Sequence, residues 1–381
     1  MNLHTAIGFE EKLAEDWFVI SNAGEIPSPA LLVYADRLEQ NIRRMIEISG
    51  KVDRLRPHIK TNKMPGVVRQ LLAQGITKLK CATIAEAEMA AECGAPDVLL
   101  AYQPVGPNIR RLLDLASAFP KTKFSTIADN AESLRALSEA ADGATTRIEV
   151  LLDIDCGQHR TGVPPDFGAW ELYRLLDSLP ALDPGGLHVY DGHINHADLR
   201  QRTIECEESF APAHTLREEL LAAHLPVPHV VAGGTPTFAI HARRTDVECS
   251  PGTCVFWDFG YGSKFTDLDF HYAALLLTRV ISRPAANRLC LDLGHKSVAS
   301  EMPHPRVHFL SLPDAKAVLH SEEHLVVETE RAGDFPVGSV LYGVPWHICP
   351  TVNLHSEALL VRDGKVCETW RVTARERKLH I

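Results

Sequence analysis

The sequence predicts an α/β protein, in which a (β/α)8 barrel of the TIM type is followed by a mostly antiparallel β domain. Two observations lead to this fold class. Short apolar runs alternate with longer helical segments from about residue 30 onward, and this alternation stops near residue 265. Continuous apolar runs between amphipathic helices are typical of parallel strands that are buried on both faces.

Eight apolar runs fit the eight strands of such a barrel. They lie at residues 30–34, 54–59, 78–82, 97–101, 123–127, 147–154, 186–190 and 229–232. The helices expected between them lie at residues 38–49, 65–74, 84–92, 131–141, 169–178 and 205–222. An open doubly wound sheet is the alternative, but no G-x-G-x-x-G turn follows the first run.

After residue 265 the helical periods become scarce and strand-like runs continue. They lie at residues 272–282, 288–293, 324–327, 338–343, 358–362 and 366–372, and turn signals such as Arg362-Asp363-Gly364 separate them. This pattern indicates an antiparallel β domain. We expect the barrel to span residues 26–264, and the β domain to combine residues 1–25 with residues 265–381.

Composition excludes several classes of protein. With 45% hydrophobic and 23% charged residues the chain is not a disordered one, and a net charge of −10 argues against a nucleic-acid partner. No apolar run approaches the roughly 20 residues that span a bilayer, so no membrane partner is expected. The chain lacks a basic-then-apolar leader, and its nine cysteines contain no C-x-x-C, so we expect reduced thiols and a cytoplasmic location.

A lysine follows the second run, in Arg56-Pro57-His58-Ile59-Lys60-Thr61. Active residues of a barrel lie at the carboxyl ends of its strands, and a partly desolvated lysine there is suited to Schiff-base chemistry. The alternative is an ordinary solvated lysine in a loop, which is how most lysines occur.

Short turns rich in glycine and hydroxyl groups follow the last strands, at residues 233–237 and 249–253. Their backbone N–H groups can surround an anion, and the late loops of a barrel are a common phosphate site. An ordinary strand-to-helix turn explains each of them equally well when it is taken alone.

A possible metal pair lies near the C-terminus, where His347 and Cys349 are two residues apart. Side chains at this spacing share one face of an extended strand, and imidazole with thiolate is a zinc-type pair. Two protein ligands leave positions open for water or substrate, which favours a catalytic metal. A buried cysteine next to an ordinary histidine is the alternative.

Four motifs together resemble the fold-type III pyridoxal-phosphate enzymes related to D-threonine aldolase and D-serine dehydratase. The motifs are residues 56–61, residues 157–162 (Gly-Gln-His-Arg-Thr-Gly), residues 233–237 and residues 345–355. The resemblance implies an alanine racemase-like barrel followed by a β domain. It also implies that Lys60 bonds the cofactor, that Arg160 and Tyr190 flank its ring, that Gly234, Thr235, Gly252 and Thr253 hold its phosphate, and that His347 and Cys349 bind a divalent metal.

The expected activity is retro-aldol cleavage of a D-3-hydroxy amino acid to glycine and an aldehyde. Dehydration of D-serine or 3-hydroxyaspartate is the first alternative. Racemisation and a role as a non-catalytic cofactor carrier are ranked below it. Aldolases of this family commonly have Asp where this chain has Cys349. Because a thiolate ligand prefers zinc, zinc is favoured over manganese or magnesium. His193 is the candidate protein base, and members of this fold type usually form homodimers.

Overall fold

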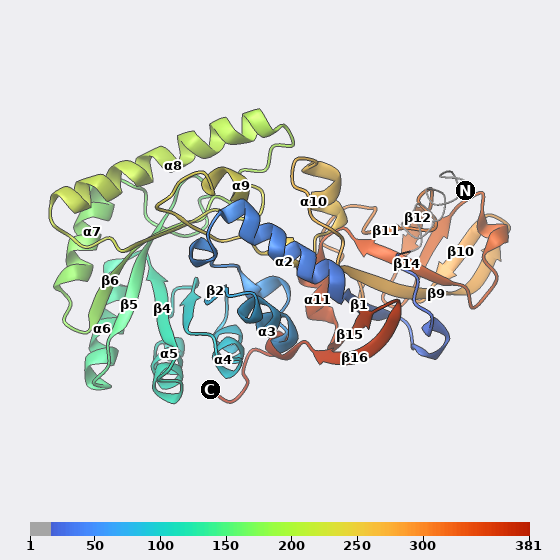
Figure 1. Cartoon of the computed structure of the whole chain (residues 1–381), viewed down its shortest axis with the longest axis horizontal. Coiled ribbons are helices and arrows are strands. Elements are labelled where there is room, and N and C mark those ends of the chain that lie inside the picture. Colours follow the sequence, from blue (N-terminus) through green and yellow to red (C-terminus); the bar gives the residue numbers. More distant parts are fainter. Residues whose placement is uncertain (1–16) are drawn as a thin grey trace, which may run out of the picture. The chain divides into compact units, whose positions relative to one another are not determined.

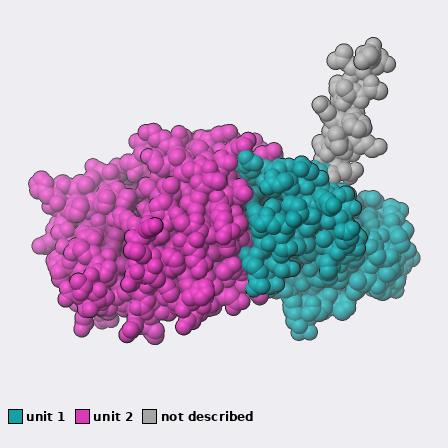
Figure 2. Space-filling view, turned by 60° about the horizontal axis from the view of Figure 1, so that its bottom comes forward, with its two compact units in different colours: residues 1–39, 256–261, 271–371 teal, residues 40–255, 262–270, 372–381 magenta. Residues whose placement is uncertain are grey.

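The computed structural model describes residues 17–381, which form two compact units (Figure 2). Unit 1 contains residues up to 39, 256–261 and 271–371, and unit 2 contains residues 40–255, 262–270 and 372–381. Most of the predicted N-terminal segment, residues 1–16, lies outside the described part of the chain. Phe18 and Ile20, which follow it, pack in the core of unit 1.

Unit 2 is built on a parallel sheet of seven strands in the order β2 to β8. Its strands are β2 (Lys78–Cys81), β3 (Asp97–Leu100), β4 (Lys123–Ala128), β5 (Ile148–Ile154), β6 (Leu182–Val189), β7 (His229–Ala232) and β8 (Glu248–Cys249). Leu99, Ile127, Leu151 and Val231 from four of these strands pack in one core cluster. Side chains of β3 and β7 meet because the sheet curls around its interior.

Residues 55–58 take the eighth position, between β8 and β2. Leu55 bridges Cys249 on one side and His58 bridges Lys80 on the other, both in parallel orientation. Backbone bonds from Arg56 N to Cys249 O (2.9 Å) and from Lys80 N to Pro57 O (3.0 Å) hold this segment in place. The sheet therefore has the barrel arrangement that the sequence predicts.

Helices lie around the outside of this sheet (Figure 1). They are α3 (Pro65–Ala73), α4 (Ile84–Glu92), α5 (Pro107–Ala118), α6 (Ala131–Gly143), α7 (Phe167–Ser178), α8 (Leu199–Ala222) and α9 (Phe238–His241). The side chains of Thr83, Asn130 and Asp166 accept backbone N–H groups at the start of α4, α6 and α7. Such caps satisfy donors that have no partner within a helix, so each one specifies where its helix begins.

The amino end of the parallel sheet carries a closed set of ion pairs. Arg56, whose side chain is 2% exposed, bonds Glu248 (2.7 Å) and Asp97 (2.5 Å). Lys78 and His229 also contact Glu248, at 2.5 and 3.1 Å. Lys78, Asp97, His229 and Glu248 are each the first residue of a strand. Together with Arg56 they form what we call the amino-end charge cluster, defined as Arg56, Lys78, Asp97, His229 and Glu248.

Unit 1 is built on a sheet of nine strands. They are β1 (Ala30–Tyr34), β9 (Ala274–Ala285), β10 (Arg288–Leu291), β11 (Val307–Phe309), β12 (Lys316–His320), β13 (Leu325–Glu328), β14 (Val340–Pro345), β15 (Glu357–Arg362) and β16 (Lys365–Arg371). All pairs are antiparallel except β1 with β15. Helices α2 (Ala35–Ser49), α10 (Phe259–Lys264) and α11 (Ile348–Leu354) complete the chain.

The expectation that residues 30–34 form the first barrel strand is wrong. This run is β1, which pairs with β9 and β15 in the sheet of unit 1. A fully apolar run indicates a strand that is buried on both faces, but it does not indicate which sheet contains the strand. The two-residue strand β8 and helix α5 were not expected. Among the described residues, no helix has both the length and the apolar character that a membrane crossing requires.

Candidate active site

Lys60 lies at the carboxyl end of the segment that occupies the eighth barrel position. It is the middle residue of a short 3-10 turn, Ile59–Thr61, and its backbone N–H donates to His58 Nδ1 at 3.3 Å. Burial, then the charges of Lys60 and Lys80, hold the pKa of His58 well below its usual value. The His58 ring is therefore neutral and can accept this bond, which fixes the turn that carries Lys60.

Three cationic side chains converge on the ring of Tyr190, which directly follows β6. Lys60 Nζ lies 5.8 Å from the ring centre, Lys80 Nζ 5.5 Å and Arg160 Cζ 5.0 Å. Three of the predicted cofactor residues, Lys60, Arg160 and Tyr190, are thus brought together from separate strand ends. Lys80 was not expected here, although a lysine inside an apolar run was a visible signal.

Lys80 belongs to a buried chain of polar groups that crosses the barrel interior. Its Nζ lies 3.4 Å from His188 Nε2, and His188 Nδ1 lies 2.7 Å from Asp153 Oδ1. All three residues are at most 4% exposed. Burial and the charge of Lys80 lower the pKa of His188, so the neutral ring donates from Nδ1 to Asp153 and accepts from Lys80 at Nε2.

The loop that carries Arg160 follows β5 and is folded around Asp155. Asp155 accepts the N–H groups of Gly157 (3.0 Å) and His159 (2.9 Å). Gly162 closes the loop with a φ of +100°, and a Cβ at this position would lie 2.5 Å from the backbone N of Asp155. This close approach explains why the motif ends in glycine. His193, the candidate base, is exposed, and a Cβ on Gly157 would lie 3.0 Å from its Nε2.

The two predicted phosphate turns meet at the hydroxyl group of Thr235. The N–H groups of Gly252 and Thr253 both donate to Thr235 Oγ1, each at 3.1 Å. A Cβ on Gly234 would lie 3.1 Å from the Tyr190 ring, and a Cβ on Gly252 would lie 3.2 Å from Thr61 Oγ1. Glycine at both positions therefore leaves these turns close to Tyr190 and to the turn that carries Lys60.

A second buried network of hydrogen bonds holds the Gly234 turn in place. Thr237 Oγ1 accepts the Gly234 N–H at 3.2 Å and donates to Asp191 Oδ1 at 2.8 Å. Asp191 Oδ2 lies 2.7 Å from His241 Nε2, and Arg244 lies 3.0 Å from His241 Nδ1. Because a guanidinium group can only donate, His241 accepts at Nδ1 and donates from Nε2 to Asp191.

These donors fit pyridoxal phosphate, the cofactor that the resemblance of the four motifs implies. Two backbone N–H groups already converge on one oxygen atom, as they would on a phosphate oxygen. The three cations around Tyr190 favour an anionic ligand, since no carboxylate of the described residues forms an ion pair with Lys60, Lys80 or Arg160. A primary amine, an anion cradle and an aromatic ring are the groups that this cofactor requires.

The predicted metal pair lies in unit 1, but not on an extended strand as expected. His347 occupies the position before helix α11 without a capping side-chain bond, and Cys349 lies in the first turn of the helix. The two side chains hydrogen-bond each other, and His347 Nδ1 lies 2.6 Å from Glu301 Oε1. Burial alone would lower the pKa of His347, but Cys349 and Glu301 raise it to about 9. Imidazole, thiol and carboxylate make a donor set that suits zinc.

Other residues of the C-terminal motif hold this segment in place. Thr351 Oγ1 donates to the His347 carbonyl at 2.8 Å and accepts the Ala299 N–H at 3.1 Å. His355 lies 2.8 Å from the Ser297 carbonyl. Glu301, which the sequence analysis did not identify, follows this anchored loop. It lies 46 residues before His347, so no local spacing could have indicated the contact.

Two other clusters bring three potential metal ligands within 4.8 Å of one another in the described residues. One is Asp191, Cys206 and His241, and the other is Glu88, Glu92 and His380. The first is the network behind the Gly234 turn, where a guanidinium group faces the histidine. The predicted pair belongs to neither cluster.

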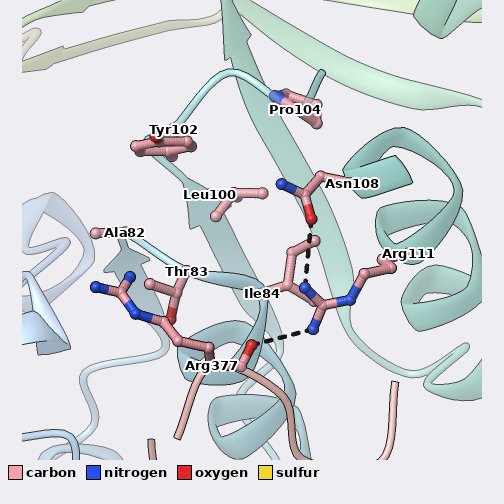
Figure 3. A pocket seen from close by; sticks show the side chains of 9 residues that line it. All are labelled: Ala82, Thr83, Ile84, Leu100, Tyr102, Pro104, Asn108, Arg111 and Arg377. Carbon is pink, nitrogen blue, oxygen red and sulfur yellow. Dashed lines mark hydrogen bonds between the residues drawn. The ribbon is translucent and has the colours of Figure 1, made fainter. Parts of the chain in front are cut away.

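A pocket beside the ends of β2 and β3 contains none of the predicted site residues (Figure 3). Arg111 reaches across it to Asn108 Oδ1 (3.3 Å) and to the Arg377 carbonyl (3.3 Å). Its lining is Ala82, Thr83, Ile84, Leu100, Tyr102, Pro104, Asn108, Arg111 and Arg377. This pocket is therefore separate from the site around Tyr190.

Comparison with known proteins gives concordant matches. Residues 33–258 match the family "Alanine racemase, N-terminal domain", and residues 273–361 match "Putative serine dehydratase domain". A D-threonine aldolase from Arthrobacter sp. is 31% identical, over 92% of this chain and 93% of the relative. A D-threo-3-hydroxyaspartate dehydratase from Delftia sp. is 28% identical, over 91% and 97%. The crystal structure of D-threonine aldolase from Filomicrobium marinum superposes with a TM-score of 0.85 at 28% identity, covering 94% of this chain and 97% of that chain.

Proposed function

The chain belongs to the alanine racemase-like, fold-type III family of pyridoxal-phosphate enzymes related to D-threonine aldolase, and on this premise we propose that it is a metal-dependent lyase. Its substrates are D-3-hydroxy amino acids, and its reaction is retro-aldol cleavage to glycine and an aldehyde. The observation that carries the proposal is the convergence of Lys60, Arg160 and the Gly234 turn on Tyr190, with the Gly252 turn beside Thr61.

Each cofactor residue has a role that follows from its position. Lys60 supplies the amine that bonds the cofactor, and the neighbouring His58 holds its turn. Gly234, Thr235, Gly252 and Thr253 bind the phosphate through backbone N–H and hydroxyl groups, while Tyr190 and Arg160 flank the ring. When bound, pyridoxal phosphate supplies an aldehyde for the substrate amine and a ring that takes up electrons from a breaking bond at Cα.

The protein's own groups must also move protons. In the aldolase reaction a base takes the proton of the 3-hydroxyl group, and His193 is the candidate because it is exposed beside the loop that carries Arg160. In the dehydratase reaction a base removes the Cα proton instead, and Lys60 is the candidate. Both reactions use the same side chains, so the residues alone do not separate them.

His347 and Cys349 hold the metal in this proposal, with Glu301 beside His347. A bound divalent ion supplies Lewis-acid polarisation of the 3-hydroxyl group. The thiol favours zinc, and manganese or magnesium are the alternatives. We also propose that the enzyme is a cytoplasmic homodimer, with domains that divide near residue 264.

The aldolase is placed first because the longer match of the C-terminal motif is to aldolases, and a full-length relative at 31% identity has that name. The dehydratase is second because Cys349 is the dehydratase-like residue and a relative at 28% identity is named as one. The substrate carries a 3-hydroxyl group in either case.

A product assay on a panel of D-3-hydroxy amino acids tests the proposal. Glycine plus an aldehyde supports the aldolase, ammonia plus a keto acid supports the dehydratase, and turnover of neither kind contradicts both.

The metal is tested with the same assay. Chelation should stop turnover while the protein stays yellow, because the Schiff base at Lys60 needs no metal. The variant Cys349→Asp should shift the preference from zinc toward manganese or magnesium. Cys367→Asp, at an exposed cysteine, is the matched control. Full turnover in the presence of chelator would overturn the metal role and raise the racemase alternative.

A further inference from the structure

Lys80 has no place in the reaction described above, yet it is the most deeply buried cation near Tyr190. It is 2% exposed and projects from β2, and its nearest polar partner, His188, lies on β6 across the barrel. A buried lysine is rare unless a partner balances its charge. The partner here is a neutral imidazole, so the ammonium charge has no direct counter-ion within the described part of the chain.

Nearby carboxylates do not fill this role, because each is engaged elsewhere. Asp153 is bonded to His188 at 2.7 Å, and Asp191 is bonded to His241 at 2.7 Å and to Thr237 at 2.8 Å. The charged and titratable groups that face Lys80 are Lys60 and Arg56, which oppose its charge, Asp153 and Asp191, which favour it, and the neutral rings of His58 and His188.

The balance of these groups leaves Lys80 easy to deprotonate. Burial, then the charge of Lys60, lower the pKa of Lys80 to about 7. An anion placed beside Lys80 acts in the opposite direction, because it favours the charged form of a neighbouring amine. Positive charge is already gathered at this end of the barrel, with Lys60 and Arg160 at 5.8 and 5.0 Å from the same ring.

We propose that Lys80 is a further residue of the cofactor site, a buried third cation that takes up a proton when an anionic ring-and-phosphate ligand binds beside Tyr190. The inference rests on the proposed cofactor site and deepens it. His188 and Asp153 act as positioning residues, because they hold the Lys80 side chain in the barrel interior through two successive hydrogen bonds.

The experiment measures proton uptake on binding. The probe is 4-deoxypyridoxine 5'-phosphate, which has the ring oxygen and phosphate of the cofactor but no aldehyde, so it cannot bond Lys60. Calorimetric titration of the cofactor-free full chain in two buffers with different ionisation enthalpies gives the number of protons taken up per probe bound.

At pH 8 the wild type should take up roughly 0.5 to 1 proton more than Lys80→Met, because Lys80 is mostly neutral before binding and charged afterwards. Lys80→Met should also bind the probe about tenfold more weakly, the loss expected for one charge-assisted contact. Lys123→Met, an exposed lysine on β4, is the control and should match the wild type in both measurements.

A pH series on the wild type needs no variant. Proton uptake should be small at pH 6, where Lys80 is already charged, and should rise toward pH 8. Binding with the same uptake at both pH values would overturn this inference and leave the cofactor proposal standing. Absence of probe binding would overturn both, so the two failures are distinguishable.

Discussion

The two ends of the parallel sheet use charge in opposite ways. At the amino end Arg56 and Lys78 are matched by Asp97 and Glu248 at 2.5 to 2.7 Å. At the carboxyl end Lys60, Lys80 and Arg160 surround Tyr190, and none of them forms an ion pair with a carboxylate in residues 17–381. A closed set of ion pairs needs no ligand, whereas a group of unmatched cations is stabilised by an anion from outside. The comparison separates residues that are paired within the barrel from residues that we propose bind the cofactor.

The strongest test of this division is Lys60→Ala. Turnover should fall on the order of 10³-fold or more, because the proposed reaction uses the Lys60 amine directly. The melting temperature should stay nearly constant, since Lys60 forms no ion pair with any described residue. Activity and thermal unfolding are measured together, and Lys296→Ala is the control at an exposed lysine.

Reduction of the wild type with borohydride complements this test. The label should appear on Lys60 in a peptide map, and a label on Lys63 or Lys296 would overturn the assignment of the cofactor lysine.

The amino-end charge cluster predicts the reverse outcome for Glu248→Gln. Loss of this carboxylate leaves Arg56 buried with one partner fewer, so the free energy of unfolding should fall by about 3 kcal/mol. The affinity for pyridoxal phosphate should be nearly unchanged. Denaturant unfolding at pH 7 measures the free energy of unfolding, and a binding titration measures the cofactor affinity. A loss of cofactor affinity without a loss of stability would contradict the division between the two ends of the sheet.

The stability difference between the wild type and the same variant should also depend on pH. Burial would raise the pKa of Glu248, but His229, Arg56 and Lys78 hold it well below the usual 4.5. A lowered carboxyl pKa stabilises the fold above about pH 4.5, and this contribution is lost as the pH falls toward the folded value. The stability advantage of the wild type over Glu248→Gln should therefore shrink below pH 4.5, as acid unfolding curves of both proteins would reveal.

Asp191→Asn sharpens the comparison, because Asp191 supports the Gly234 turn at the carboxyl end through Thr237. Breaking its bonds to Thr237 and His241 should cost about 2 kcal/mol of stability. The Gly234 turn should lose its support, so pyridoxal phosphate should bind about tenfold more weakly while pyridoxal, which has no phosphate, binds unchanged. Equal losses for both ligands would show that Asp191 acts on the whole site, and Asp114→Asn is the exposed control.

The smallest effect is expected from an exposed ion pair. Lys123 and Glu149 lie 2.6 Å apart, but the Lys123 side chain is 51% exposed. Lys123→Met should therefore change the free energy of unfolding by less than about 1 kcal/mol. A loss as large as that of Glu248→Gln would show that burial does not distinguish the ion pairs of this sheet.

The sequence predicts that the motif residues gather at the carboxyl end, because each follows a strand and the ends of parallel strands meet at one edge. Lys60, Arg160 and Tyr190 do lie together there. It does not predict their partners. Lys80, Asp153 and His188 lie inside strands, where an isolated polar residue gives no indication of what it contacts across a barrel. Glu301 reaches His347 only through tertiary folding.

Two structural predictions failed for a related reason. Residues 30–34 have the composition of a barrel strand, but partner choice depends on the whole chain. The pair His347 and Cys349 was expected on a strand, yet α11 begins at Ile348. Asp258 accepts the Ile348 N–H at 3.1 Å, and this long-range contact helps the helix to begin there.

The division of the chain between the two units has a consequence for its synthesis. The last segment of unit 2, residues 372–381, is made after the chain has completed unit 1. In the folded protein Lys63 Nζ donates a hydrogen bond to the Ala374 carbonyl, and the Ala374 N–H donates one to the Lys63 carbonyl. A ribosome therefore cannot release one finished unit before it makes the next, and neither unit corresponds to one continuous stretch of the gene. Nascent chains halted near residue 265 should remain sensitive to protease, because both units still lack segments that are encoded downstream.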